Sequence, residues 1–174
     1  NTFCSTMTEY LDKKNNFISI YFFIGITILI SLVLEIFISN LFNLSVYLPI
    51  SLMFLIYWNM ALPKDIGLIW AMIFGFCLDV NQEILLGSHV LLFLLISYLT
   101  QRYFHRLRAL YMIQQSLFVA AVILIYQIIL ILFFSEFKGS IFLELILMTV
   151  SSAFLWPIIF GILRQLRIKF IQSS

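Results

Sequence analysis

Charge is the scarcest feature of this sequence. Only 10% of its 174 residues are Asp, Glu, Lys or Arg, against about a quarter in soluble domains, and 63% are hydrophobic. Together with a mean hydropathy of +1.10, this composition excludes an ordinary soluble domain and predicts a chain that lies in a lipid bilayer. At this length we expect several spans of about 20 residues and no separate soluble domain.

Residues that carry common catalytic chemistry are also few. Cys4 and Cys77 have neither disulfide nor zinc spacing, and His89 has no second ligand at helical spacing. The sequence contains no G-x-S-x-G elbow and no H-E-x-x-H motif. A two-aspartate protease is disfavoured because Asp65 is predicted at the membrane face opposite Asp79. We therefore expect no enzyme, no metal site and no cofactor.

Long apolar runs fill most of the chain. They divide it into a polar N-terminal tail at 1–16, a transmembrane domain at 17–163 and a basic tail at 164–174. The predicted fold class is an all-α membrane protein, a six-transmembrane-helix bundle. Its apolar segments lie at residues 17–40, 46–62, 66–79, 84–100, 112–135 and 140–163.

The third segment is too short to cross a bilayer alone. A helix of about 14 residues rises about 21 Å, whereas the hydrocarbon layer is about 30 Å thick. Its polar ends, at Lys64-Asp65 and at the acidic turn 79–83, are therefore expected at membrane depth.

The basic residues predict the orientation. With six spans and a cytoplasmic N-terminus, nine of the ten lysines and arginines lie on the cytoplasmic side. Only Lys138 lies outside, and both termini are cytoplasmic. The nine are Lys13, Lys14, Lys64, Arg102, Arg106, Arg108, Arg164, Arg167 and Lys169.

A stripe of small residues marks the third segment. Gly67, Ala71, Gly75 and Asp79 follow one another at four-residue spacing, on one slowly turning face of a helix. Small residues allow a neighbouring backbone to come close in lipid. We hypothesise that this face forms a groove for a partner's transmembrane helix; the alternative is packing within the chain.

Glu35 is a candidate site in the first span. It lies between Ser31 and Ser39 at four-residue spacing, in the outer half of the predicted helix. A carboxylate at this depth is a functional candidate. One alternative is that it is hydrated or pairs with Lys138, and the other is that it meets His89 or a partner protein inside the bundle.

Asp79 and His89 flank the turn before the fourth span. With Gln82 three residues later, Asp79 resembles an N-cap of that turn. His89 follows Gly87-Ser88, where Ser88 is placed to cap the fourth helix and the imidazole falls in its first turn. The alternative is that Asp79 meets His89 inside the bundle.

Arginines mark the predicted cytoplasmic surface. Arg102, Arg106 and Arg108 lie in a predicted loop, and Arg164 and Arg167 follow the last span. We expect them to contact anionic lipid, at about 1 kcal/mol per cation. Docking of an acidic cytosolic partner is the alternative, and the cations are too few for a nucleic-acid track.

Three further residues predict features of packing. Pro157 lies inside the last run and predicts a kink, because proline removes a helical hydrogen bond. Asn59 and Gln127 offer side-chain amides that can bridge helices, at about 1 kcal/mol each.

Several short elements, taken in order, resemble the signature of the rod shape-determining protein MreD family. The resemblance covers most of the chain after about residue 46. It rests on Tyr57-Trp58, Leu62-Pro63, Gly67, Gly75, Leu78-Asp79, Leu86-Gly87, His89, Tyr98-Leu99, Leu155-Trp156-Pro157 and Arg164-Gln-Leu-Arg167.

This resemblance implies a non-enzymatic scaffold of the bacterial cell-elongation machinery in the inner membrane, involved in rod-shape determination and lateral peptidoglycan synthesis. The implied partners are the bitopic MreC, MreB filaments, and the pair of RodA and penicillin-binding protein 2. The implied fold is similar to the substrate-binding (S) components of ECF-type vitamin transporters. A small-solute binding or transport module is the alternative function.

Overall fold

The computed structural model describes residues 2–42, 48–63, 68–82, 86–134 and 141–172, with side chains described for 21–41, 48–63, 68–81, 86–132 and 143–169. Every regular element in these ranges is a helix. The helices are α1 (Thr2–Phe42), α2 (Ile50–Ala61), α3 (Leu68–Gln82), α4 (Ser88–Ala109), α5 (Met112–Phe134) and α6 (Ile141–Gln172).

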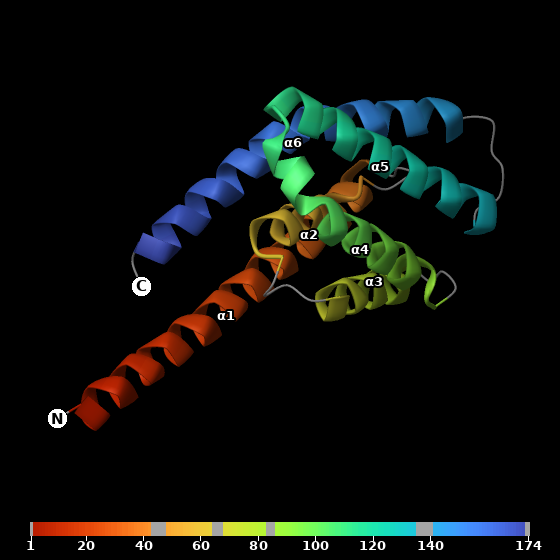
Figure 1. The fold of residues 1–174 in the computed structure, drawn as a ribbon. Helices are drawn as coiled ribbons and strands as arrows, with labels where there is room; N and C mark the ends of the chain where they lie inside the picture. The colour runs from red at the N-terminus through yellow and green to blue at the C-terminus, as the bar shows by residue number, and fades with distance from the viewer. Residues whose placement is uncertain (1, 43–47, 64–67, 83–85, 135–140, 173–174) are drawn as a thin grey trace.

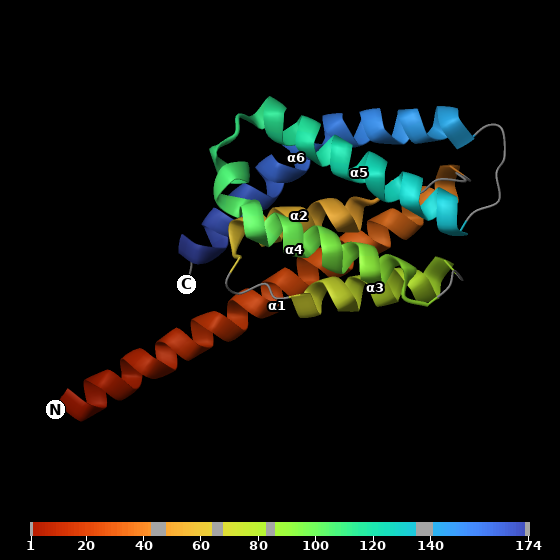
Figure 2. The same ribbon diagram turned by 45° about the vertical axis from the view of Figure 1, so that its right-hand side comes forward.

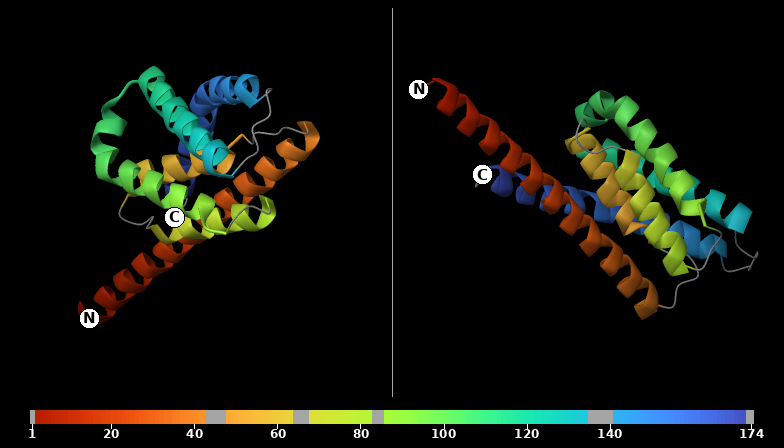
Figure 3. Two further views of the ribbon diagram at one scale, coloured as in Figure 1. Left: turned by 90° about the vertical axis from the view of Figure 1, so that its right-hand side faces the viewer. Right: turned by 90° about the horizontal axis from the view of Figure 1, so that it is seen from below.

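Neighbouring helices form hairpins around a central short helix. Helix α3 lies beside α4, and α5 lies beside α6 (Figure 1). Helix α2 contacts α1, α4 and α6, so it occupies the middle of the bundle (Figure 2). The first part of α1 projects away from the other helices in every view, and both termini lie toward the same end of the molecule (Figure 3).

The buried residues of α2 explain its central place. Ten of its twelve residues are buried, including the fully covered Leu52, Met53 and Leu55. A helix that is apolar on all sides packs best where neighbours surround it. Trp58, a predicted site residue, belongs to this core: it is 1% exposed and donates from Nε1 to Thr27 Oγ1 at 3.1 Å.

The outer surface of the bundle is apolar. Phe22, Ile113 and Phe154 are more than 70% exposed. Three stretches are long and apolar enough to cross a membrane: Tyr21–Leu41, Met112–Leu132 and Leu143–Lys169. Helices Ile50–Ala61 and Leu68–Asn81 are apolar but shorter. The prediction of a helical membrane protein is confirmed, whereas the number of six crossings stays a prediction.

Two predicted loops are helical instead. The predicted basic loop at 102–108 forms the last turns of α4, which ends only at Ala109. Arginine and glutamine favour helix, and the cations near its C-terminus complement the helix dipole. The turn predicted to begin at Asp79 was also placed too early, because α3 continues to Gln82. Helices α1 and α6 likewise run into the segments 1–16 and 164–174 that were predicted as tails.

Pro157 lies inside α6, where the missing N–H leaves the carbonyl four residues earlier without its helical partner. That carbonyl belongs to Ala153, and it accepts a hydrogen bond from Ser116 Oγ of α5. Helix α6 changes direction along its length, as a proline kink predicts (Figure 1). The α5–α6 hairpin thus satisfies the backbone group that the proline releases.

The predicted amide bridge at Asn59 is confirmed. Its Nδ2 donates to Ser97 Oγ at 3.0 Å, and its Oδ1 accepts from Gln101 Nε2 at 2.8 Å. Both partners lie on α4, so one buried amide joins α2 to α4. Gln127 is buried on α5.

Candidate functional site

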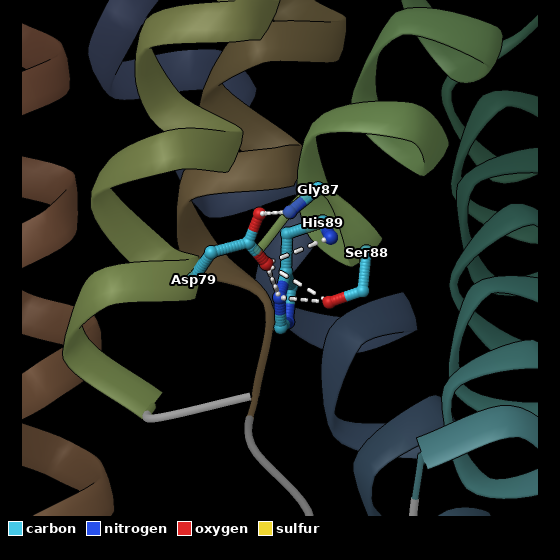
Figure 4. Close-up of polar contacts among 4 residues, drawn as sticks. All are labelled: Asp79, Gly87, Ser88 and His89. Atoms are coloured by element: carbon cyan, nitrogen blue, oxygen red, sulfur yellow. Dashed lines mark hydrogen bonds and ion pairs between the residues drawn. The ribbon is translucent and has the colours of Figure 1, made fainter. Parts of the chain in front are cut away.

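Asp79 is buried at the end of α3 and caps the next helix. Its Oδ2 accepts from the backbone N–H of Gly87 at 2.8 Å, and its Oδ1 accepts from the N–H of His89 at 2.9 Å and the hydroxyl of Ser88 at 2.9 Å (Figure 4). The first N–H groups of a helix lack helical partners and attract negative charge. The prediction that Asp79 is a local N-cap is therefore wrong in one respect: it caps α4 from inside α3.

Gly87 occupies the N-cap position of α4 that Ser88 was expected to fill. Its φ of 107° lies in the left-handed region that favours glycine. Ser88 follows as the first helical residue and binds Asp79 through its hydroxyl. The left-handed turn at Gly87 directs the three donors of α4 toward one carboxylate.

The imidazole of His89 also contacts Asp79. Its Nδ1 lies 2.7 Å from Oδ1, and its side chain is fully buried. An ionised carboxylate only accepts hydrogen bonds, so Nδ1 carries the hydrogen. The expectation that Asp79 meets His89 inside the bundle is confirmed. The other ring nitrogen, Nε2, is buried and has no hydrogen-bond partner among the described residues.

Glu35 of α1 caps α2 in the same way that Asp79 of α3 caps α4. It is 3% exposed, and its Oε2 accepts from the backbone N–H of Ser51 at 2.9 Å and from the Ser51 hydroxyl at 2.5 Å. Ser51 is the second residue of α2. Burial contradicts the interpretation of Glu35 as a hydrated residue, and Lys138, its other suggested partner, lies outside the described residues. Ser31 and Ser39 bond to carbonyls of their own helix.

The small-residue stripe faces the chain's own helices. A Cβ atom added to Gly75 would lie 2.4 Å from Val90 Cα and 2.5 Å from Val90 N, so the backbones of α3 and α4 cross there in direct contact. Ala71 is fully buried. At these two positions the geometry supports internal packing and leaves no groove for a partner. Gly67 lies outside the described residues.

Pro63 and Arg108 mark the other end of α2. Pro63 follows the C-cap residue Leu62 and is half-buried. Arg108 of α4 donates from Nε to the Met60 carbonyl at 2.5 Å and from Nη2 to the Ala61 carbonyl at 2.7 Å. Arg108 was predicted to contact the membrane surface, but it satisfies the last carbonyls of α2.

The other predicted surface arginines are accessible to different degrees. Arg102, Arg106 and Arg164 are exposed, and Arg167 is half-buried. The guanidinium of Arg106 lies 6.0 Å from the Tyr103 ring centroid, within the range of a cation–π contact. These four residues can still reach a lipid surface.

An open groove lies between α4 and α5. It encloses about 440 Å³, and its lining is almost wholly apolar, with Thr100 and Arg106 as exceptions. Among its walls are Leu99 of α4, 45% exposed, and Ile125 of α5, 57% exposed. Unlike the small-residue stripe, this groove is accessible at the surface of the bundle.

Apart from the contact of Asp79 with His89, sequence reasoning missed the partners of the two carboxylates. Ser51 and Gly87 were not linked to Glu35 and Asp79 as donors, although a serine in the first turn of a helix is a weak signal of a capped end. The capping role of Arg108 left no local signal, because its targets lie 47 and 48 residues away. In the part of the chain that the structure describes, no three metal-ligating side chains come together.

Comparisons of the sequence with known proteins identify one family. The model of the rod shape-determining protein MreD family matches residues 16–166. The chain is 29% identical over 116 residues to the rod shape-determining protein MreD of Haemophilus influenzae, covering 66% of this chain and 72% of that relative. No solved structure matches, so the likeness to S components stays a prediction. The chain belongs to the rod shape-determining protein MreD family, whose members are structural membrane proteins and not enzymes.

Proposed function

We propose that this chain is a multi-pass inner-membrane scaffold that binds the transmembrane helix of MreC and links it to MreB and to RodA with penicillin-binding protein 2. Membership of the MreD family supports a role in rod-shape determination. All six helices are embedded in the bilayer, and both termini are cytoplasmic. The termini lie toward the same end of the bundle, as an even number of crossings requires (Figure 2).

The groove between α4 and α5 is the observation that carries the binding proposal. Helices associate in lipid through close packing of complementary surfaces, because lipid tails remove any hydrophobic drive. The groove has a volume of about 440 Å³, and its concave apolar surface gives a partner helix more contact than a convex helix face does. Arg106 at one end of the groove is placed to meet an acidic residue or lipid phosphate at the partner's membrane boundary.

Tryptophan substitutions in the groove test this proposal. Leu99→Trp and Ile125→Trp fill the groove without altering the buried core, because both side chains are already exposed. We expect co-purification with MreC to fall about tenfold, the loss of about 1.4 kcal/mol of association free energy. Ile69→Trp, on the exposed face of α3, is the matched control. Unchanged co-purification by all three variants would place the MreC contact elsewhere.

The orientation is tested by cysteine labelling. In a background in which Cys4 and Cys77 are replaced by serine, single cysteines are introduced at Arg106 and at Lys138. A membrane-impermeant maleimide should label Lys138→Cys from the periplasm and Arg106→Cys only after the membrane is opened. Labelling of both from the same side would contradict six crossings.

Cell shape separates the scaffold from the transport alternative. Depletion in a rod-shaped host should round the cells if the chain supports lateral wall synthesis. A small-solute module would instead leave rods with impaired uptake of the solute, and that outcome would overturn the scaffold proposal.

A further inference from the structure

A cationic cavity of about 380 Å³ lies where α2 and α4 end and α5 begins. Three arginines line it, Arg108 from α4 and Arg164 and Arg167 from α6, together with Tyr57 and Gln115. This is the end of α2 opposite the one that Glu35 caps. The cavity is therefore separate from both buried carboxylates.

The described residues supply no negative charge to balance these arginines. The ion pair found among the described residues joins Asp79 to His89, and it lies at the other end of α4 from the cavity. Arg108 uses part of its guanidinium on the carbonyls of α2. Arg164 and Arg167 have no hydrogen-bond or ion-pair partner in the described ranges. Three like charges around one concave surface concentrate positive potential and favour an anion there.

Two buried polar atoms in the lining add a second, independent indication of a ligand. Tyr57 is 2% exposed, and its hydroxyl has no hydrogen-bond partner among the described residues. Gln115 is 6% exposed; its Nε2 donates to the carbonyls of Leu107 at 2.9 Å and Leu110 at 3.3 Å, which leaves Oε1 buried without a partner there. Buried polar atoms are normally satisfied, so an unpaired donor and an unpaired acceptor on two residues that line one cavity indicate a missing polar partner.

We propose that this cavity binds a phosphate ester that carries a hydroxyl group. Guanidinium groups bind phosphate oxygens through paired N–H donors, which suits Arg164 and Arg167. The Tyr57 hydroxyl donates to the same phosphate, and Gln115 Oε1 accepts from the ligand's hydroxyl. A glycerol-phosphate lipid headgroup and a soluble phosphate ester share this chemistry. The site does not depend on the proposed contact with MreC.

Lipid retention tests the site on the intact chain. The protein is released from nanodiscs containing equal phosphatidylglycerol and phosphatidylcholine, and native mass spectrometry counts the phosphatidylglycerol it keeps. R164Q/R167Q should lower retention at least tenfold, because hydrogen bonds to charged groups contribute most of such binding. Tyr57→Phe should lower it about fivefold, since it removes one neutral donor.

R102Q/K169Q is the matched control. It removes the same charge from two exposed residues outside the cavity. Retention should be unchanged in this variant. Equal losses in the two double variants would overturn the proposal, because they would show general attraction between a cationic surface and anionic lipid.

A second arm distinguishes the source of the phosphate. In nanodiscs of phosphatidylcholine alone, glycerol 3-phosphate and inorganic phosphate are titrated while the melting temperature is followed. A rise with glycerol 3-phosphate that R164Q/R167Q abolishes supports the site with a soluble ligand. Retained phosphatidylglycerol without such a rise supports the site with a lipid headgroup. Absence of both effects in the unaltered chain would overturn the proposal.

Discussion

The first four helices and the last two differ in length and in how the free backbone groups at the helix starts are satisfied. Helices α2 and α3 have 12 and 15 residues and rise about 18 and 22 Å, less than the hydrocarbon thickness. Helix α5 has 23 residues and rises about 35 Å. The starts of α2 and α4 bind a buried carboxylate of the preceding helix in place of water, whereas no such cap is seen at the start of α6 among the described residues.

The α1–α2 and α3–α4 hairpins are capped in the same way. In each, a buried carboxylate near the end of one helix accepts backbone and hydroxyl donors at the start of the next: Glu35 for Ser51, and Asp79 for Gly87, Ser88 and His89. The hairpin of α5 and α6 has Glu144 in the first turn of α6 instead, with Oε2 buried and without a partner among the described residues. Charge stabilises a helix start only where it meets the free N–H groups.

The crossing at Gly75 gives the largest expected effect. Gly75→Leu should abolish the folded protein, because even a Cβ would overlap the α4 backbone, and overpacking costs about 3 kcal/mol or more when backbone must move. The measurement is the monodisperse yield in detergent. Gly161→Ala, whose added Cβ would meet no atom within 4 Å, is the control and should keep full yield. A folded Gly75→Leu protein with lost MreC binding would restore the partner-groove hypothesis.

The carboxylate caps come next and test the comparison between hairpins directly. Asp79→Asn should destabilise by about 3 kcal/mol, because it breaks a buried pair with His89 and removes a shared acceptor. Glu35→Gln should cost about 2 kcal/mol, since Ser51 keeps a weaker acceptor.

Glu144→Gln is the control for both caps, because the described residues give its buried oxygen no donor. It should change stability by less than about 0.5 kcal/mol. Melting temperatures of the three variants in one detergent measure the order. An equal loss at Glu144 would remove the distinction between the capped hairpins and the third.

The C-terminal cap of α2 is expected to contribute less. Arg108→Gln should destabilise by about 1 kcal/mol, because the arginine is exposed and water can replace part of its contact with Met60 and Ala61. Thermal unfolding compared with Arg106→Gln, which removes the same charge two residues away on α4, measures this. A loss as large as that of Glu35→Gln would show that both ends of α2 are equally shielded from water.

The smallest effect concerns the proline in α6. Ser116→Ala should cost about 1 kcal/mol, the loss of its hydrogen bond to the Ala153 carbonyl. In a Pro157→Ala background the helix can satisfy that carbonyl itself, so the same change should cost almost nothing. A double-mutant cycle on melting temperature tests this coupling. Equal costs in both backgrounds would show that Ser116 does not compensate for the proline.

Much of the fold follows from runs of apolar residues and their breaks. The ends of α2 and α5 fall within a few residues of the predicted segments, because prolines and polar residues interrupt the hydrophobic pattern there. The ends of α3 and α4 were misplaced at Asp79 and at the basic segment after residue 100. In both places a charged residue that looks like loop in sequence is held in helix by a tertiary partner or by the helix dipole.

The candidate site was predicted as residues but not as contacts. Four site residues stand out in sequence. A carboxylate or imidazole in an apolar run is costly to place in lipid, which marks Glu35, Asp79 and His89. A glycine there allows another helix to come close, which marks Gly75. Apart from the contact between Asp79 and His89, their partners could not be assigned, since periodicity identifies a helix face and not the helix that covers it. Arg108 illustrates the limit, because its position in a basic segment suggested lipid while its contacts are with α2.

The sequence by itself determined that this chain is helical, apolar and suited to a bilayer, because composition and run length set the free energy of transfer into lipid. Tertiary structure alone decided that Glu35 and Asp79 cap helices and that Gly75 packs against the backbone of α4. It also decided that Tyr57 and three arginines line one cavity. Those outcomes depend on the angles and distances between helices, which arise from packing among residues far apart in the sequence.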